Sequence, residues 1–110
     1  MGTQLYFTNG KPVIMKGSYR GQDYAIISHG SHPCAYIETD KGSLFDNDDL
    51  DCHGGVTWRD FHEDVNHYCV GWDYAHSCDY TNYFPSEDGK KWSLEEIDTE
   101  VRQVIDSVLG

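Results

Sequence analysis

The sequence is short of positive charge and of long apolar runs, and each shortage argues against a class of protein. Eight Lys and Arg residues face nineteen Asp and Glu residues in a chain of 110, which gives a net charge of −11. Such a potential repels phosphate, so we expect no direct binding of nucleic acid. No apolar run approaches the roughly 20 residues that span a bilayer, so we expect no membrane segment.

Export signals and cysteine pairs are also missing. Residues 1–17 contain no basic region followed by a long apolar stretch, so we predict no signal peptide and a cytoplasmic protein. Cys34, Cys52, Cys69 and Cys78 form no C-x-x-C pair. We therefore expect reduced thiols rather than disulfides or a thiolate zinc knuckle.

The end of the chain carries the clearest signal for secondary structure. Ser93 and Glu96 have the spacing of a capping box, and apolar residues then recur every three or four positions as far as Val108. This pattern predicts an amphipathic helix over about residues 93–109. Acids early in this segment, such as Glu95, complement the positive end of the helix dipole.

The preceding part of the chain indicates short strands. Asn9-Gly10 between two apolar runs predicts a hairpin turn, and Pro12 places the strand that follows it at a sheet edge. We predict further strands at 23–28, 35–38, 55–58 and 68–72. The expected fold is a single α+β domain over 1–110, a small antiparallel sheet with the C-terminal amphipathic helix packed on one face.

Residues 59–67 join two of these predicted strands. They are rich in charge, and we interpret them as a connection in which His62 and His67 lie at the surface.

Acidic charge is concentrated after residue 37. Residues 1–37 carry three basic side chains and one acidic, a net of +2, and residues 38–110 carry five basic and eighteen acidic, a net of −13. This surface either simply keeps the protein in solution or attracts a basic surface, such as a groove that normally holds nucleic acid. We expect residues 40–51 to form a mobile surface loop. The candidate contacts with a basic partner lie in this loop and in the first helical turn: Asp46, Asp48, Asp49, Asp51, Glu95 and Glu96.

Histidine and aspartate gather in the middle of the chain. His53 is followed by two glycines, which let the backbone bend close beside it. Asp73, His76 and Asp79 stand three residues apart, a spacing that brings side chains to one side of a helical turn. Imidazole and carboxylate together suit zinc or another divalent metal. The alternative is that these histidines are exposed or hydrogen-bonded and that the aspartates form turns.

Two motifs resemble a group of small proteins common in bacteria and their phages. They are His-Gly-Gly-Val-Thr at 53–57 and Gly-Trp-Asp-Tyr-Ala-His-Ser-Cys-Asp at 71–79, and Gly-Ser-His-Pro at 30–33 is similar to a third element of that group. The chain most resembles a metal-binding type II anti-CRISPR protein, an inhibitor of an RNA-guided Cas nuclease. The resemblance spans about residues 30–109 and implies these metal ligands: His32, His53, Asp73, His76 and Asp79.

The chain departs from that pattern in the long, charged segment 59–67 and at Cys78, where a small residue is usual. Cys52 and Cys78 lie beside the proposed ligands and could add a thiolate. Our first hypothesis is a non-enzymatic inhibitor whose acidic surface binds the positively charged channels of a type II Cas nuclease. In this hypothesis a structural divalent metal, with zinc as the first candidate, holds the fold together. The sequence does not determine the oligomeric state, and we favour a monomer. Two alternatives are a metal-dependent hydrolase with Asp73 or Asp79 as general base, and a metal-free acidic interaction domain.

Overall fold

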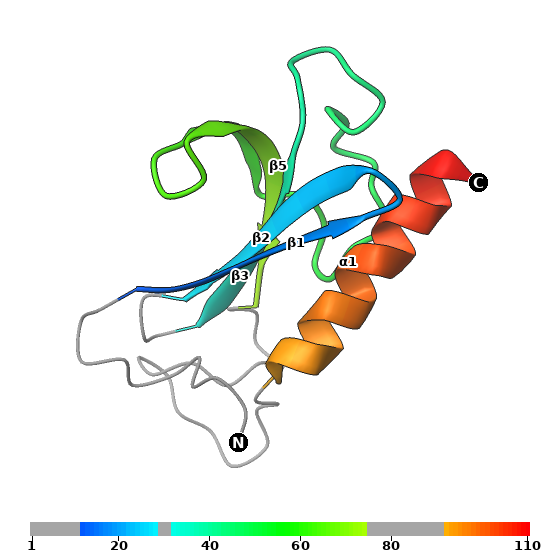
Figure 1. The fold of residues 1–110 in the computed structure, drawn as a ribbon. Coiled ribbons are helices and arrows are strands. Elements are labelled where there is room, and N and C mark those ends of the chain that lie inside the picture. Colours follow the sequence, from blue (N-terminus) through cyan, green and yellow to red (C-terminus); the bar gives the residue numbers. More distant parts are fainter. Residues whose placement is uncertain (1–11, 29–31, 75–91) are drawn as a thin grey trace.

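The computed structural model describes residues 12–28, 32–74 and 92–110, and places one helix on one face of an antiparallel sheet (Figure 1). Across the sheet that the described residues form, the strands lie in the order β1-β2-β3-β5-β4, and each is antiparallel to its neighbours. The predicted α+β fold is confirmed. The elements are β1 (Val13–Tyr19), β2 (Gln22–Ser28), β3 (Pro33–Glu38), β4 (Trp58–His62), β5 (His67–Asp73) and α1 (Leu94–Leu109).

The hairpin between β1 and β2 is closed by Arg20 and Gly21. Both have positive φ, 53° and 78°. Two central residues with positive φ match the twist of the flanking strands, and glycine adopts this conformation at no steric cost. β1 lies at one edge of the sheet that the described residues form, where Pro12 predicts it. The predicted Asn9-Gly10 turn lies outside the described residues.

Alternation along the central strands directs side chains into two clusters. In β2, Tyr24 and Ile26 pack in the cluster that includes α1, whereas Ala25 and Ile27 pack on the opposite face. Burial of one large apolar side chain contributes roughly 1.5–3 kcal/mol. The buried apolar residues of α1 therefore form the main attachment of the helix to the sheet. The buried residues of the helix are Ile97, Val101, Val104 and Ile105.

The face away from α1 is closed by the ring of Tyr36, which lies over Gly71. A Cβ added at Gly71 would sit 2.4 Å from Cδ1 of Tyr36 and 2.6 Å from the carbonyl oxygen of Ala35. Trp58 meets the Tyr36 ring edge-on, with centroids 6.4 Å apart, and His62 is tilted against it at 4.5 Å. His62, predicted at the surface, is therefore half-buried against Tyr36.

The prediction for the middle strands needs a correction. β4 begins at Trp58 rather than at Gly55 and continues to His62, so much of the segment interpreted as a connection is strand. Residues 63–66 alone join β4 to β5. Within the described part of the chain β4 is an edge strand, and charged side chains are common on edges because they face water. Its charge concealed it in the sequence.

The capping box predicted at the start of α1 is present. The Glu96 N–H donates to the Ser93 hydroxyl at 3.2 Å, and the Ser93 N–H donates to the Glu96 carboxylate at 3.0 Å. Among the described residues, no helix has the length and apolar character needed to cross a membrane.

Three tyrosines connect the sheet to the acids of the helix, and we call these hydrogen bonds the tyrosine bridges. Each phenol donates to a carboxylate of α1: Tyr24 to Asp98, Tyr74 to Glu100, and Tyr19 to both oxygens of Asp106 at 3.0 and 3.1 Å. The pKa of Tyr24 and of Tyr74 is raised mainly by burial, and that of Tyr19 by its bond to Asp106. The phenols therefore stay protonated at neutral pH, as the bridges require.

Candidate functional site

The segments that carry the described candidate ligands lie at one end of the sheet. His32 directly precedes β3, and Asp73 ends β5. These strand ends are adjacent, since the Tyr74 N–H donates to the Pro33 carbonyl at 3.1 Å. His53, from the loop before β4, lies on the ring of Tyr74. Three segments that are distant in the sequence therefore meet here.

Two aromatic rings hold His53. Its imidazole stacks on Tyr74, with centroids 4.9 Å apart and planes within 6°, and is tilted against Trp92 at 4.9 Å. Tyr74 and Trp92 are themselves 5.0 Å apart. We call these three rings the His53 cluster. Stacking of this kind constrains the plane of the imidazole and so the directions of its two nitrogens.

The backbone bends beside His53, as its two glycines predict. Gly54 and Gly55 have φ of 70° and 85°, in the left-handed region that glycine favours. The Gly55 N–H donates to the Cys52 carbonyl at 3.1 Å, which closes the turn.

Beneath the His53 cluster, the Tyr74 hydroxyl joins strand to helix. Tyr74 is buried; its hydroxyl accepts from the Trp72 indole N–H at 2.9 Å and donates to Glu100. Neither Tyr74 nor Trp92 is among the residues predicted for this site. A signal existed for Trp92, which directly precedes the helix cap at Ser93, where an apolar residue commonly packs on the first turn. No local signal distinguishes Tyr74 from its neighbours.

The thiol next to His53 is protonated at neutral pH. Burial, followed by the charge of Glu100, raises the pKa of Cys52 to about 12. Burial also raises the pKa of Cys34 to about 11 and that of Cys69 to about 12. These three cysteines are free thiols, as predicted. Cys78 lies outside the described residues.

The described donors do not by themselves complete a metal site. Within residues 12–28, 32–74 and 92–110, no group of three or more His, Cys, Asp or Glu side chains is placed to hold an ion. His76 and Asp79, the remaining predicted ligands, lie outside these residues. The metal therefore stays a prediction that depends on them.

The acidic loop 40–51 is attached to the core rather than loose. Phe45 and Leu50 are both buried in the cluster under α1. Asp49 and Asp51 are exposed, as predicted for partner contacts. The Asp48 side chain is 71% exposed. This loop therefore presents its outer acids from a fixed base.

Asp46 is the exception among the predicted contacts, because its side chain is only 5% exposed. Its carboxylate accepts from the Gly42 N–H at 2.7 Å, the Tyr68 hydroxyl at 2.7 Å and Arg59 Nε at 3.0 Å. The prediction that Asp46 contacts a partner is corrected, since this carboxylate is used to hold the loop against β4 and β5. Its hydrogen bonds, first of all the one from Gly42, lower the pKa of Asp46 from 3.8 to about 2.

Asp46→Asn should weaken the acid sensitivity of the fold. Because the folded pKa of Asp46 is depressed, the unfolded chain takes up its proton first as pH falls. The stability from this carboxylate is thus complete above pH ~4 and is lost as pH falls toward ~2. We expect the variant to melt about 5 °C lower at pH 7 and to lose less on acidification. Circular dichroism melts measure both, with Asp49→Asn, from the same loop, as the neutral control. Parallel wild-type and Asp46→Asn curves would contradict the assignment.

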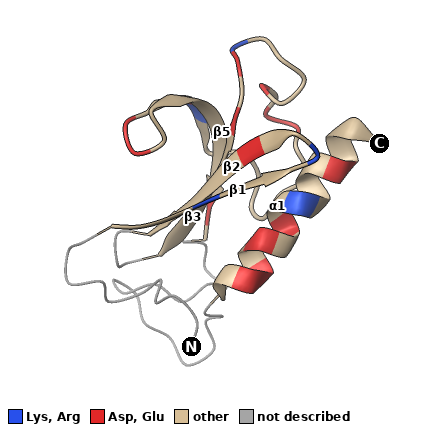
Figure 2. Ribbon diagram, in the orientation of Figure 1, with Lys and Arg blue, Asp and Glu red and all other residues tan. Residues whose placement is uncertain are grey.

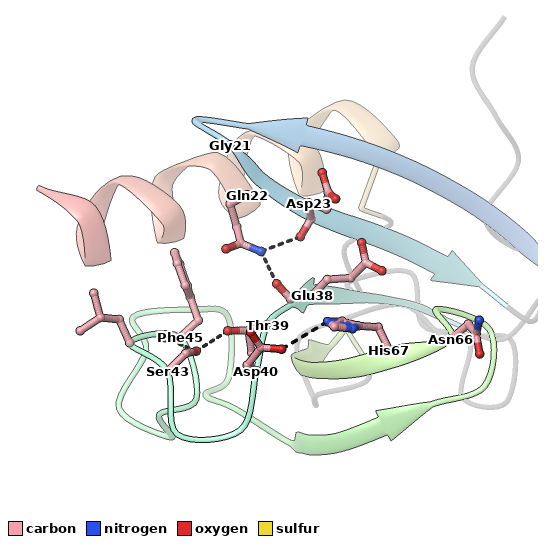
Figure 3. A pocket seen from close by; sticks show the side chains of 11 residues that line it. Gly21, Gln22, Asp23, Glu38, Thr39, Asp40, Ser43, Phe45, Asn66 and His67 are labelled. Atoms are coloured by element: carbon pink, nitrogen blue, oxygen red, sulfur yellow. Dashed lines mark hydrogen bonds and ion pairs between the residues drawn. The ribbon is translucent and has the colours of Figure 1, made fainter.

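An open cavity of about 710 Å³ borders the acidic loop (Figure 3). His67, which begins β5, lines this cavity, whereas Tyr74 of the His53 cluster follows the other end of that strand. Three carboxylates line it, from Asp23, Glu38 and Asp40. His67 Nε2 lies 3.7 Å from the Asp40 carboxylate, and the Gln22 amide donates to the Glu38 carbonyl. We call this hollow the acidic groove. It lies beside the loop that carries Asp48, Asp49 and Asp51.

No family model, curated protein or solved structure matches the chain. Two features of the molecule bear on its function: the acidic groove with its loop, and the His53 cluster.

Proposed function

We propose that this protein is a non-enzymatic inhibitor that occupies a basic, nucleic-acid-holding surface of a type II Cas nuclease. The resemblance of residues 53–57 and 71–79 suggests the partner, and the surface charge suggests the mechanism. The channel of such a nuclease is positively charged because it holds a guide–target duplex. A compact acidic protein in that channel gains the same attraction and keeps nucleic acid out.

The observation that carries the proposal is the state of the arginines. All three are held in ion pairs of the chain's own: Arg20 with Asp106 at 2.9 Å, Arg59 with Asp46 at 3.0 Å, and Arg102 with Asp98 at 3.0 Å. Each pair joins one arginine to one carboxylate. The carboxylates in excess of these pairs therefore set the surface potential. Figure 2 shows acidic positions along α1 and on the loops, with few basic ones between them.

The shape of the acidic surface supports the same proposal. Asp48 and Asp49 project from the loop beside a groove that is itself lined by carboxylates. Charges of one sign around a hollow reinforce one another more than on a flat surface, because low-dielectric walls focus the field. Glu95, exposed in the first turn of α1, is a second acidic position of the predicted contact set.

The test is inhibition of DNA cleavage by guide-loaded type II Cas nucleases over a salt series. Exposed charges are screened beyond about 10 Å at 0.1 M salt, so we expect inhibition to weaken steadily as salt is raised. Asp49→Asn and Glu95→Gln should each weaken inhibition by about two- to fivefold, the equivalent of one exposed ion pair.

Ser18→Lys is the matched control, because it changes the net charge by the same amount at an exposed position of β1 outside the predicted contacts. If all three variants weaken inhibition equally, only net charge matters and the loop is not the contact. If the wild-type protein inhibits none of the nucleases at low salt, the proposed function is wrong.

We also propose that a divalent metal, with zinc as the first candidate, holds together the segments that meet at this end of the sheet. What supports it is that His32 and Asp73 flank adjacent strand ends, while His53 stacks on the residue next to Asp73. Imidazole and carboxylate donors suit this ion. The candidate ligands are His32, His53, Asp73, His76 and Asp79, of which a tetrahedral site uses four.

A further inference from the structure

Two aromatic side chains are exposed on β4, which is an edge strand of the described sheet. Trp58 is 37% exposed and Phe61 is 51% exposed. Together with His62, Glu63 and Asp64 they line a cavity of about 370 Å³. The hairpin from β4 to β5 and helix α1 lie at opposite sides of the molecule (Figure 1). We call this surface the β4 patch.

The β4 patch offers side chains more than a backbone edge. The Phe61 N–H already donates to the Asp60 carboxylate at 2.7 Å, and the Trp58 indole N–H donates to the Asp60 carbonyl at 3.0 Å. A strand edge whose polar groups are satisfied in this way is a poor template for another strand. A partner would therefore be recognised by the rings and the charges around them.

Charge around the β4 patch is negative. Asp60 and Glu63 are exposed beside the two rings, and Asp64 lines the same cavity. The one basic residue of β4, Arg59, is paired with Asp46 at 3.0 Å and lies 3.9 Å from Asp48, so its charge is directed to the acidic loop. Exposed rings bordered by carboxylates suit a cation that is both flat and charged.

We propose that the β4 patch binds an arginine side chain of a protein partner, with the guanidinium plane on Phe61, the more exposed of the two rings, and its N–H groups on the neighbouring carboxylates. A guanidinium stacks on aromatic faces and is weakly hydrated, whereas the ammonium of lysine is a compact, strongly hydrated charge. Aromatic residues and arginine also dominate the energetics of protein interfaces. This inference deepens the proposed function by naming the group that the partner supplies, and it rests on that function only for the partner's identity.

The experiment is calorimetric titration of the full chain with an arginine homopeptide and with a lysine homopeptide of the same length. The two peptides carry the same charge, so their long-range attraction to the acidic surface is the same. We expect the arginine peptide to bind about three- to fivefold more tightly, the gain expected from one exposed cation–π contact.

Variants at Phe61 separate the ring from its apolar surface. Phe61→Leu should remove the preference for arginine, and Phe61→Tyr should keep it, because only the second retains an aromatic face. Leu44→Ala is the control, since Leu44 is 73% exposed on the acidic loop and should leave the preference unchanged. Melting curves check that each variant is folded.

Equal affinity of the wild type for both peptides, or a preference that survives in Phe61→Leu, overturns the inference. So does concentration-dependent self-association that Phe61→Leu abolishes, because the patch would then be a contact between copies of the chain. The titration contains no nuclease, so its result is independent of the inhibition assay. If the wild type prefers arginine but inhibits no nuclease, the inference about the β4 patch stands and the proposed function is wrong.

Discussion

Gly71→Ala should lower the free energy of unfolding by about 3 kcal/mol, the upper range for overpacking a filled core. The added methyl group would lie 2.4 Å from Cδ1 of Tyr36 and 2.6 Å from the Ala35 carbonyl oxygen. That carbonyl belongs to β3, which pairs directly with β5, so it cannot swing away. The Tyr36 ring is itself held by Trp58 and His62. Relief therefore requires the two central strands to separate.

Thermal denaturation followed by circular dichroism measures this loss, which corresponds to a fall of about 10–20 °C in melting temperature. Gly21→Ala is the control: nothing lies within 4 Å of its added Cβ, but its φ of 78° makes any side chain strained. That strain alone costs about 1 kcal/mol, so the control should lose much less. A Gly71→Ala variant as stable as Gly21→Ala would mean that Tyr36 does not lie over Gly71.

Removal of the proposed metal should have an effect of similar size. An ion at a hundredfold excess over its Kd stabilises a fold by about 2.7 kcal/mol, and a chelator withdraws that amount. We expect elemental analysis of protein purified without added metal to find about one zinc ion per chain, as a single four-ligand site requires. Chelator should then lower the melting temperature.

Variants decide whether the ion is held where we propose. His53→Ala and His76→Ala should lose the ion and become insensitive to chelator, whatever His53→Ala costs through its stacking on Tyr74. His67→Ala is the control, because His67 faces Asp40 in the acidic groove, at the other end of the sheet. A wild type that is metal-free and ignores chelator favours the plain acidic interaction domain. An ion whose loss abolishes hydrolytic activity but leaves the melting temperature unchanged favours the hydrolase.

Elements whose signals are local could be predicted from the sequence. Ser93, Glu96 and apolar residues repeated every three or four positions predict the helix. The structure contains both the capping box and the buried apolar face. The central strands were found because one of their faces is apolar. β4 was misplaced because an edge strand is exposed, which removes the alternation that identifies a strand. The turn at Gly21 also has a local signal, because glycine readily adopts the positive φ that the turn requires.

The candidate site was only partly predictable because its residues come together across the chain. Nothing near His53 in the sequence indicates that its imidazole stacks on Tyr74 and Trp92, which belong to other segments. Asp46 resembles the exposed acids around it, yet it is buried by Tyr68 and Arg59 from two later strands. Burial of a polar side chain by distant partners leaves no periodic trace in a sequence.

The tyrosine bridges have a further consequence for α1. An apolar stripe packed on a sheet is attracted without regard to direction, so by itself it would tolerate sliding or rolling of the helix by a fraction of a turn. Hydrogen bonds are directional and short-ranged, and those from Tyr19, Tyr24 and Tyr74 hold the helix at three successive points along its axis. These hydrogen bonds fix the axial position and the rotation of the helix. The acidic first turn that carries Glu95 therefore has one defined position on the molecule.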